Sequence, residues 1–229
     1  MSIIAIIPAR SGSKRIPDKN IKDFKGYPLF YWSVKFAVDS GLCDQIVFAS
    51  DSEQYLEMCQ AFFGNKVKLV LRPADVSKDD STDTETFQYI LKEIKSDDDD
   101  IIIHLRPTFP IRSQNVLKEA LEKMKEPSIF SVRTVCKSDI CIPKYYLFDK
   151  DGHITSALNP SMVDISEPEN RGKQFLPVFY KHNGDIDVTT AWIITKACRM
   201  TTRKGTYGII DDIDIDIDDI SDFDKAMEV

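Results

Sequence analysis

The chain has 229 residues, of which 42% are hydrophobic and 29% charged, and its formal net charge is −7. These values are typical of one globular domain with an ample core, and the acidic balance argues against nucleic acid as a partner. No apolar run approaches the roughly 18 residues of a membrane-spanning helix, and no signal-peptide pattern is present. We therefore expect a cytoplasmic protein without membrane contact.

The cysteines and histidines indicate neither disulfides nor a metal site. The five cysteines lack CxxC spacing, which predicts buried or partly buried thiols: Cys43, Cys59, Cys136, Cys141 and Cys198. The three histidines are scattered and form no HExxH pattern: His104, His153 and His182.

The chain opens with an isoleucine-rich run, Ser2 to Ile7, which predicts a strand buried on both faces of a parallel sheet and ended by Pro8. A basic loop (residues 9–22) follows, with small residues first and then five cations against one acid. Such a loop after the first strand is where an open α/β sheet binds its ligand, and small residues let backbone N–H groups approach a phosphate. We predict a triphosphate site. A solvated basic surface is the alternative, because the Walker pattern GxxxxGK[ST] is absent.

Strands and helices alternate through the next part of the chain. Apolar spacing predicts helices at 28–40, 51–63, 83–95 and 113–125, and strands at 45–49, 67–71, 101–105 and 128–135. This order predicts a doubly wound, mainly parallel sheet of the Rossmann-like kind. The acidic run at 97–100 indicates a solvated turn, with metal binding as the alternative.

The composition changes between about 136 and 180, where prolines break the chain into short extended pieces and residues 150–153 indicate a hairpin turn. We predict one domain over residues 1–229 with an extended insertion at 137–182, acting as a dimerisation arm or substrate lid. An irregular surface excursion is the alternative. Strands at 186–195 and 207–210 and a helix at 219–228 complete the expected order.

An acidic segment (residues 211–219) alternates aspartate with isoleucine. In an extended backbone this alternation puts the carboxylates on one face and the isoleucines on the other. Clustered carboxylates suit a divalent cation, and Mg²⁺ takes one or two of them together with phosphate oxygens. A strand with a solvated polar face is the alternative.

The opening pattern I-I-P-A-R-x-G-S-K-R-x-P-x-K-N resembles the first motif of the acylneuraminate cytidylyltransferases, the CMP-sialic acid synthetase family, which includes CMP-legionaminic and CMP-pseudaminic acid synthetase-like members. Further matches are L-R-P-A at 71–74, L-R-P-T-F-P-I-R at 105–112, N-R-G-K-Q at 170–174, an L-P…N-G element at 176–184 and D-I-D-D-I-S-D-F at 216–223. The matches cover essentially the whole chain. The resemblance implies a nucleotidyltransferase.

In that family the first loop wraps the CTP phosphates. The resemblance therefore implies nucleotide contacts for Ala9, Arg10, Ser11, Gly12, Ser13, Lys14, Lys19, Asn20 and Arg72. It implies Mg²⁺ on Asp216 and Asp218, with Asp214 as the alternate because the repeat leaves a two-residue ambiguity of register. We expect substrate contacts from Arg106, Thr108, Arg171, Lys173, Gln174 and Asp185. Arg10, Lys14, Lys19 and Asp216 are the expected catalytic groups, acting by positioning and charge stabilisation.

Two departures from the family pattern bear on the substrate. Arg106 stands where glutamine is usual, and Asp185 and Asp187 add acids near the expected sugar site. Whether Arg106 binds substrate or pairs with one of these aspartates stays open. The changes suggest a nonulosonic acid of legionaminic or pseudaminic type.

We therefore expect a homodimeric cytidylyltransferase that converts CTP and an acidic 2-keto sugar to a CMP-sugar and pyrophosphate. Two alternatives stay open. One is an enzyme of the same fold that acts on a deoxyoctulosonate or a sugar phosphate, or with another nucleotide. The other is a non-catalytic nucleotide-binding module.

Overall fold

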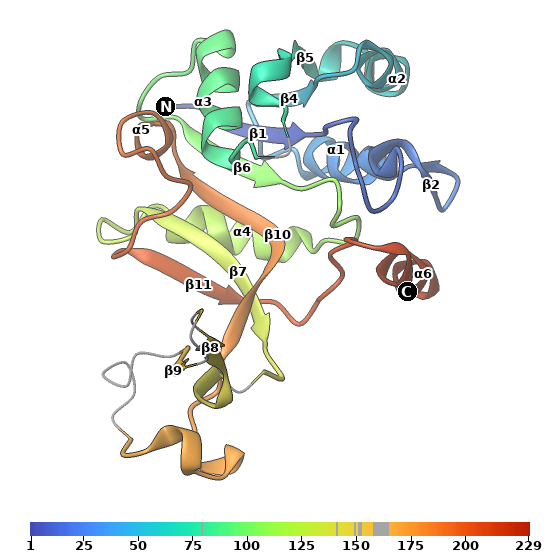
Figure 1. Ribbon diagram of the computed structural model, residues 1–229. Helices are drawn as coiled ribbons and strands as arrows, with labels where there is room; N and C mark the ends of the chain where they lie inside the picture. Colours follow the sequence, from blue (N-terminus) through green and yellow to red (C-terminus); the bar gives the residue numbers. More distant parts are fainter. Residues whose placement is uncertain (79, 141, 149, 151–152, 158–164) are drawn as a thin grey trace.

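The computed structural model describes residues 1–78, 80–140, 142–148, 150, 153–157 and 165–229. Cys141 and the centre of the expected turn at 150–153 lie outside these residues. The architecture is a seven-stranded sheet in the order β11-β7-β10-β6-β1-β4-β5, with helices on both faces (Figure 1). The expected doubly wound α/β fold is confirmed.

The strands of this sheet are β1 (Ile3–Pro8), β4 (Gln45–Ser50), β5 (Lys68–Leu71), β6 (Ile101–Leu105), β7 (Ser131–Lys137), β10 (Tyr180–Thr190) and β11 (Thr206–Ile210). All neighbouring pairs are parallel except those of β10, which runs antiparallel between β6 and β7. Two small hairpins pair β2 (Asp23–Phe24) with β3 (Tyr27–Pro28) and β8 (Tyr146–Phe148) with β9 (Ile154–Ser156).

The α-helices are α1 (Leu29–Ser40), α2 (Glu53–Phe63), α3 (Asp83–Ile94), α4 (Gln114–Lys123), α5 (Ala191–Thr195) and α6 (Ile220–Glu228). Single 3₁₀ turns include Lys19–Ile21, Gly64–Lys66, Ala74–Val76, Ile142–Lys144, Pro168–Asn170 and Lys173–Phe175. Side-chain caps fix several helix starts. Ser52 caps α2, and capping boxes of Thr82 with Glu85 and of Asp219 with Asp222 begin α3 and α6.

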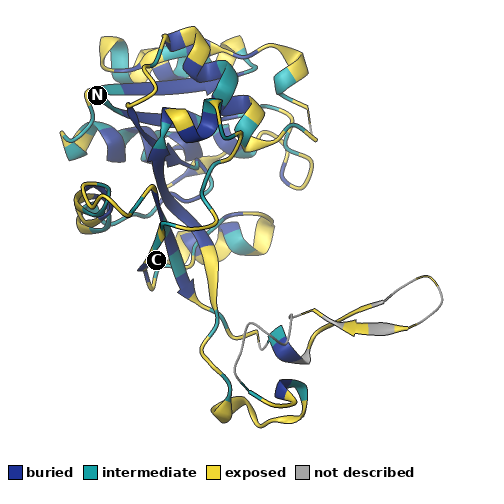
Figure 2. Ribbon diagram, turned by 90° about the vertical axis from the view of Figure 1, so that its left-hand side faces the viewer, coloured by how far each residue is buried: buried dark blue, intermediate teal, exposed yellow. Residues whose placement is uncertain are grey.

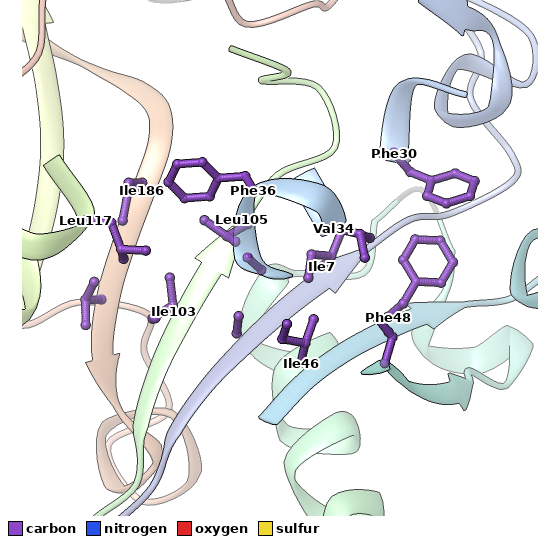
Figure 3. Packing of buried hydrophobic residues seen from close by; sticks show 14 of the residues in the cluster. Ile7, Phe30, Val34, Phe36, Ile46, Phe48, Ile103, Leu105, Leu117 and Ile186 are labelled. Carbon is purple, nitrogen blue, oxygen red and sulfur yellow. The ribbon is translucent and has the colours of Figure 1, made fainter. Parts of the chain in front are cut away.

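The buried strands divide their side chains between two cores because successive residues point to opposite faces of the sheet. Ala5 and Ile7 of β1 face the core beneath α1, α2 and α4, whereas Ile4 and Ile6 face the core beneath α3 and α5. Figure 3 shows part of the first core, in which the rings of Phe30 and Phe48 lie 4.7 Å apart. Both faces of the sheet are therefore fixed to helices.

The strand expected at 186–195 is wrong at its end. β10 stops at Thr190, and Ala191–Thr195 forms the short helix α5. Its β-branched residues favour a strand, but the backbone N–H groups of Ala191 and Trp192 donate to Asp100 and Asp98 instead of to a neighbouring strand. Tertiary contacts therefore override local propensity here.

An arm projects from the sheet between β7 and β10, and most of its described residues are exposed (Figure 2). Lys137 and Tyr180 are partners in the β7–β10 register, and Ser138 N donates to Phe179 O at 2.9 Å. The arm thus leaves and rejoins the sheet at neighbouring positions. Its exposed apolar side chains include Tyr145, Leu147, Phe175 and Val178.

The four described cysteines are free thiols, as predicted, although Cys198 is exposed rather than buried. Burial raises the pKa of the Cys59 thiol to about 12. Among the described residues, no helix has both the length and the apolar character that crossing a bilayer requires.

Candidate functional site

A cleft of about 330 Å³ opens at the carboxyl ends of the parallel strands. Its lining comes from segments that follow three different strands and from the start of α3. The polar lining residues are Arg10, Ser13, Lys19, Asn20, Arg72, Ser77, Lys78, Ser81, Asp83, Thr86, His104, Arg106 and Thr108. Five residues predicted to bind nucleotide and two predicted to bind substrate therefore share one cavity.

The basic loop is held in place by partners that the sequence did not reveal. The carboxylate of Asp51 accepts hydrogen bonds from Ser11 N at 2.8 Å and Ser11 Oγ at 3.0 Å. Asn20 Nδ2 donates to Arg10 O at 2.9 Å. Ser52 caps α2, and the carboxylate of Asp51 is therefore available to fix the loop.

Arg72 is a buried cation with few partners. Its side chain is 4% exposed, and its nearest acid is Asp51, whose Oδ1 lies 3.9 Å from Nη2. Neither Nε nor Nη2 of Arg72 has a hydrogen-bond partner among the described residues, and nor has the buried Oδ1 of Asn20. Burial lowers the pKa of Arg72, with Asp51 acting in the opposite sense. Unsatisfied buried donors are costly, so this pair suits an anionic ligand that also donates a hydrogen bond.

Lys19 joins the basic loop to the acidic segment. Its Nζ donates to Ile217 O at 2.6 Å and lies 3.6 Å from Asp218 Oδ1. Ile217 N in turn donates to Thr108 O at 2.8 Å. Burial lowers the pKa of Lys19, and the nearby carboxylates of Asp218 and Asp216 partly offset this effect. The contacts bring the first and last motifs together.

The acidic segment puts Asp214, Asp216 and Asp218 on one cavity, whereas Ile215 and Ile217 pack into a small apolar core, as the alternation predicted. Asp214 pairs with Lys181 at 2.6 Å, while Asp216 and Asp218 lie near Lys19. Asp216 Oδ1 is buried without a hydrogen-bond partner in the described structure, and burial raises the pKa of this carboxyl group. Its Oδ2 would lie 3.1 Å from a Cβ built on Gly184, whose φ is +83°. Glycine at 184 therefore allows close approach by Asp216.

Arg106 forms ion pairs with two aspartates, one of which, Asp187, is a partner that the sequence offered. Its Nη1 lies 3.0 Å from Asp187 Oδ2 and its Nη2 lies 3.4 Å from Asp83 Oδ2. Arg133 Nε and His182 Nε2 also approach Asp187 Oδ1, at 2.7 Å and 3.1 Å. Burial alone would raise the pKa of Asp187, but these three partners hold it far below its usual value.

Asp185 does not line the cleft as a substrate-binding residue would. Its side chain is completely buried, and Oδ1 lies 3.0 Å from Arg112 Nε. Arg112 also donates to Ser33 Oγ at 2.8 Å and to Arg106 O at 2.7 Å. Asp185 lies where the β7–β10 register shifts between His182 and Asp187, as at a β-bulge. Asp185 thus contacts the cleft wall indirectly, through Arg112 and its hydrogen bond to the backbone of Arg106.

The sequence profile of the cytidylyltransferase family matches residues 4–141. The chain belongs to this family. Pseudaminic acid cytidylyltransferase of Campylobacter jejuni is 40% identical over 125 residues, which cover 54% of this chain and 53% of the relative. This match thus spans about half the length of that relative. CMP-N,N'-diacetyllegionaminic acid synthase of Legionella pneumophila is 32% identical over 83% of this chain and 79% of its own.

The fold of this cytidylyltransferase is also that of a solved CMP:2-keto-3-deoxy-manno-octonic acid synthetase complexed with CTP. The TM-score is 0.69 at 16% identity, over 100% of this chain and 98% of the other. At this identity the likeness concerns the fold alone.

Three predicted substrate-binding residues of this cytidylyltransferase lie on the arm and do not line the cleft: Arg171, Lys173 and Gln174. Lys173 Nζ donates to Asp139 O at 2.9 Å, and Arg171 Nε donates to Ser166 O at 3.3 Å. Lys173 and Gln174 line a separate cavity of about 260 Å³ at the base of the arm. The structure of one chain therefore does not bring these residues to Arg106 and Thr108.

Four predicted nucleotide-binding residues also stay out of the cleft lining: Ala9, Ser11, Gly12 and Lys14. Ala9 is buried and donates its N–H to Ala49 O, so it extends the β1–β4 pairing. A Cβ added to Gly12 would meet nothing within 4 Å, so this part of the loop faces open space.

One acidic cluster lies at the opposite edge of the sheet from the cleft. Among the described residues, Asp97, Asp99 and Asp100 form the one group of three whose ligand atoms gather within 4.8 Å. Asp100 precedes β6, is buried, and accepts hydrogen bonds from Ser2 N and Ser96 Oγ. It is therefore a structural part of the turn rather than a solvated residue.

Proposed function

We propose that the protein is a CMP-nonulosonate synthetase, which transfers the cytidylyl group of CTP to the hydroxyl of an acidic 2-keto sugar and releases pyrophosphate. The observation that carries the proposal is Arg72, a buried cation with unsatisfied donors that lines the same cleft as Arg10 and Lys19. An anionic nucleotide satisfies these donors and offsets the burial of the charge. Asn20 Oδ1 accepts from the amino group of the base.

Phosphoryl transfer needs positioning and charge stabilisation more than covalent help from the protein. Arg10, Lys14 and Lys19 hold the triphosphate and stabilise the departing pyrophosphate. Backbone N–H groups of the basic loop approach the phosphates beside Gly12, where no side chain intervenes.

We propose that Asp216 and Asp218 hold Mg²⁺. The fit rests on Asp216 Oδ1, which is buried and has no hydrogen-bond partner in the described structure, as suits an oxygen that ligates a cation. When bound, the ion neutralises charge on the phosphate oxygens. Asp214 is the alternate, and it pairs with Lys181 at 2.6 Å, as Asp218 pairs with Arg15 at 3.1 Å.

The acceptor is proposed to be a nonulosonic acid of pseudaminic or legionaminic type, as the names of the two curated relatives suggest. Arg106 and Thr108 contact it from the cleft wall. The pairs of Arg106 with Asp187 and Asp83 fix the guanidinium group and restrict which substituents fit beside it. Because the reaction consumes CTP, we also propose a cytoplasmic location.

We further propose a homodimer in which the arm, as the insertion at 137–182, reaches the cleft of the partner. The arm exposes apolar side chains, and Arg171, Lys173 and Gln174 lie away from the cleft of their own chain. Mixing Asp216→Asn and Arg171→Ala proteins tests this arrangement. If the arm acts on the partner, random exchange leaves about a quarter of the sites intact and restores activity. A mixture as inactive as its two components would exclude it.

The main test is pyrophosphate release with Mg²⁺, using each nucleoside triphosphate and a panel of nonulosonic acids, deoxyoctulosonate and sugar phosphates. We expect turnover with CTP and a nine-carbon acid, and loss of CTP affinity in Arg72→Met. Turnover only with deoxyoctulosonate or a sugar phosphate would reassign the acceptor. Nucleotide binding without turnover of any acceptor would show that the protein is a non-catalytic nucleotide-binding module.

A further inference from the structure

A second cavity of about 420 Å³ opens beside the acidic segment. Asp216 lines this side cavity, and its hydrogen-bond partner Thr108 lines the cleft. The other charged groups of the side cavity are Lys181, Asp214, Asp218, Asp222 and Lys225, and His182 completes one wall. The hydrogen bond between Asp216 and Thr108 therefore joins the wall of the side cavity to the wall of the cleft.

His182 is oriented by Asp187. The Nε2 atom of His182 lies 3.1 Å from Asp187 Oδ1, and the carboxylate is 2% exposed. Arg133 and Arg106 contact the same carboxylate and keep it charged. A charged carboxylate only accepts hydrogen bonds, so Nε2 carries the hydrogen and the lone pair lies on Nδ1.

The carboxylates around the side cavity already have partners. Asp214 pairs with Lys181 at 2.6 Å. Asp222 accepts from the backbone N–H groups of Asp218 and Asp219, each at 3.2 Å. Asp218 lies 3.6 Å from Lys19, and Asp216 is proposed for the cation. Among the described groups lining the cavity, Nδ1 of His182 is the base that these contacts leave available.

We propose that His182 is the general base of the transfer, with Asp187 as its positioning residue. This inference rests on the proposed function. The acceptor hydroxyl gives its proton to His182 Nδ1 as its oxygen forms a bond to the α-phosphorus. The bond from that phosphorus to the bridging oxygen breaks, and pyrophosphate leaves with the electron pair. Asp187 stabilises the imidazolium ion, while Arg106 and Arg133 prevent Asp187 from taking the proton itself.

The experiment compares the pH dependence of pyrophosphate release in the wild type, His182→Gln and His182→Ala. Glutamine retains an N–H group that can donate to Asp187 but cannot act as a base, so it controls for structure. For the wild type, kcat/KM should rise with pH along an acid limb and then level off. In His182→Gln, kcat should fall about 100-fold or more, the acid limb should disappear, and the Kd for CTP should stay within about threefold.

Free imidazole should restore turnover to His182→Ala, since it supplies the missing base. If His182→Gln keeps the acid limb of the wild type, whatever its rate, His182 is not the base. That outcome leaves the proposed function intact, because the wild type still turns over. A wild type inactive with every acceptor would contradict the proposed function instead.

Discussion

The ammonium group of Lys19 donates to the carbonyl oxygen of Ile217 at 2.6 Å, although the two residues are 198 positions apart. Ile217 is completely buried in a small core with Ile16, Phe24 and Phe223. Apolar docking of the acidic segment on the basic loop therefore places two aspartates beside a cation of the cleft. The charged groups need this apolar anchor because like charges alone would separate the aspartates.

Replacing Lys19 should disable the site more than it destabilises the fold. Lys19→Met removes the cation that neighbours Asp216 and Asp218, so kcat/KM for CTP should fall by about 100-fold or more. Lys22→Met is the matched control, because Lys22 belongs to the same loop but lies over the ring of Phe223, at 5.3 Å. Equal kcat/KM values for the two variants would remove Lys19 from the mechanism.

Gly12 offers a test of phosphate approach that leaves the protein's own packing untouched. A Cβ at this position meets nothing within 4 Å, so Gly12→Ala should keep the wild-type Tm. If phosphates lie against the loop, the added methyl group should weaken CTP binding about tenfold or more, as measured by calorimetry. Gly208→Ala is the control: this residue lies in β11, its Cβ would lie 3.8 Å from Val135 of β7, and the change should alter neither quantity. Unchanged CTP affinity in Gly12→Ala would show that the phosphates do not bind against this part of the loop.

The two acidic clusters should respond differently to substitution. Chelation with EDTA should abolish turnover and added Mg²⁺ should restore it. Asp216→Asn should lower kcat about 100-fold or more and raise the Mg²⁺ concentration that gives half-maximal rate. Asp99→Asn, in the cluster at the opposite edge of the sheet, should keep the wild-type Mg²⁺ dependence. A Mg²⁺ dependence lost in Asp99→Asn and kept in Asp216→Asn would reverse the assignment.

The buried Asp185 should make stability depend on pH. Burial raises the pKa of Asp185 to about 7, while Arg112 acts in the opposite sense. An unfolded aspartate loses its proton near pH 4, so between pH 4 and 7 the folded protein holds a proton that the unfolded chain has released. The free energy of unfolding therefore falls as pH rises through this window, by about 2 kcal/mol from pH 5 to pH 7.

Urea denaturation at pH 5 and pH 7 measures this change. Asp185→Asn should abolish this contribution of about 2 kcal/mol. The exposed Asp39, on α1, provides the control, and Asp39→Asn should keep the slope of the wild type. The idea fails if wild type and Asp185→Asn show the same difference between the two pH values.

Much of the fold could be predicted from local patterns. β6 occupies 101–105 as expected, and the starts of α3 and α6 follow from capping residues that act within four positions. The antiparallel direction of β10 and its bulge could not be predicted, because both depend on partners in β6 and β7 far along the chain. The sequence shows that Asp185 and Asp187 depart from the family pattern, but it does not predict whether either aspartate is buried or faces the cleft.

The candidate site was predicted in part for the same reason. Arg10, Lys19, Asn20 and Arg72 share a motif or a basic context that the sequence displays, and they do line one cleft. Asp51 and Arg112 were missed, since their roles arise from contacts with Ser11 and Asp185 that have no periodic signal. In the sequence, the only sign of either role is that Asp51 and Arg112 are charged residues outside any amphipathic pattern.

The neighbouring positions of Lys137 and Tyr180 have a consequence for how the protein changes over time. Paired residues on adjacent antiparallel strands lie about 5 Å apart, so the arm is a closed excursion with both ends at one point. Such a segment behaves as a cassette, because its length and contents can be exchanged without altering the order or register of any strand in the sheet. Natural variation, or an engineered exchange between relatives, can therefore replace the sequence of the arm without changing the residues of the nucleotide cleft.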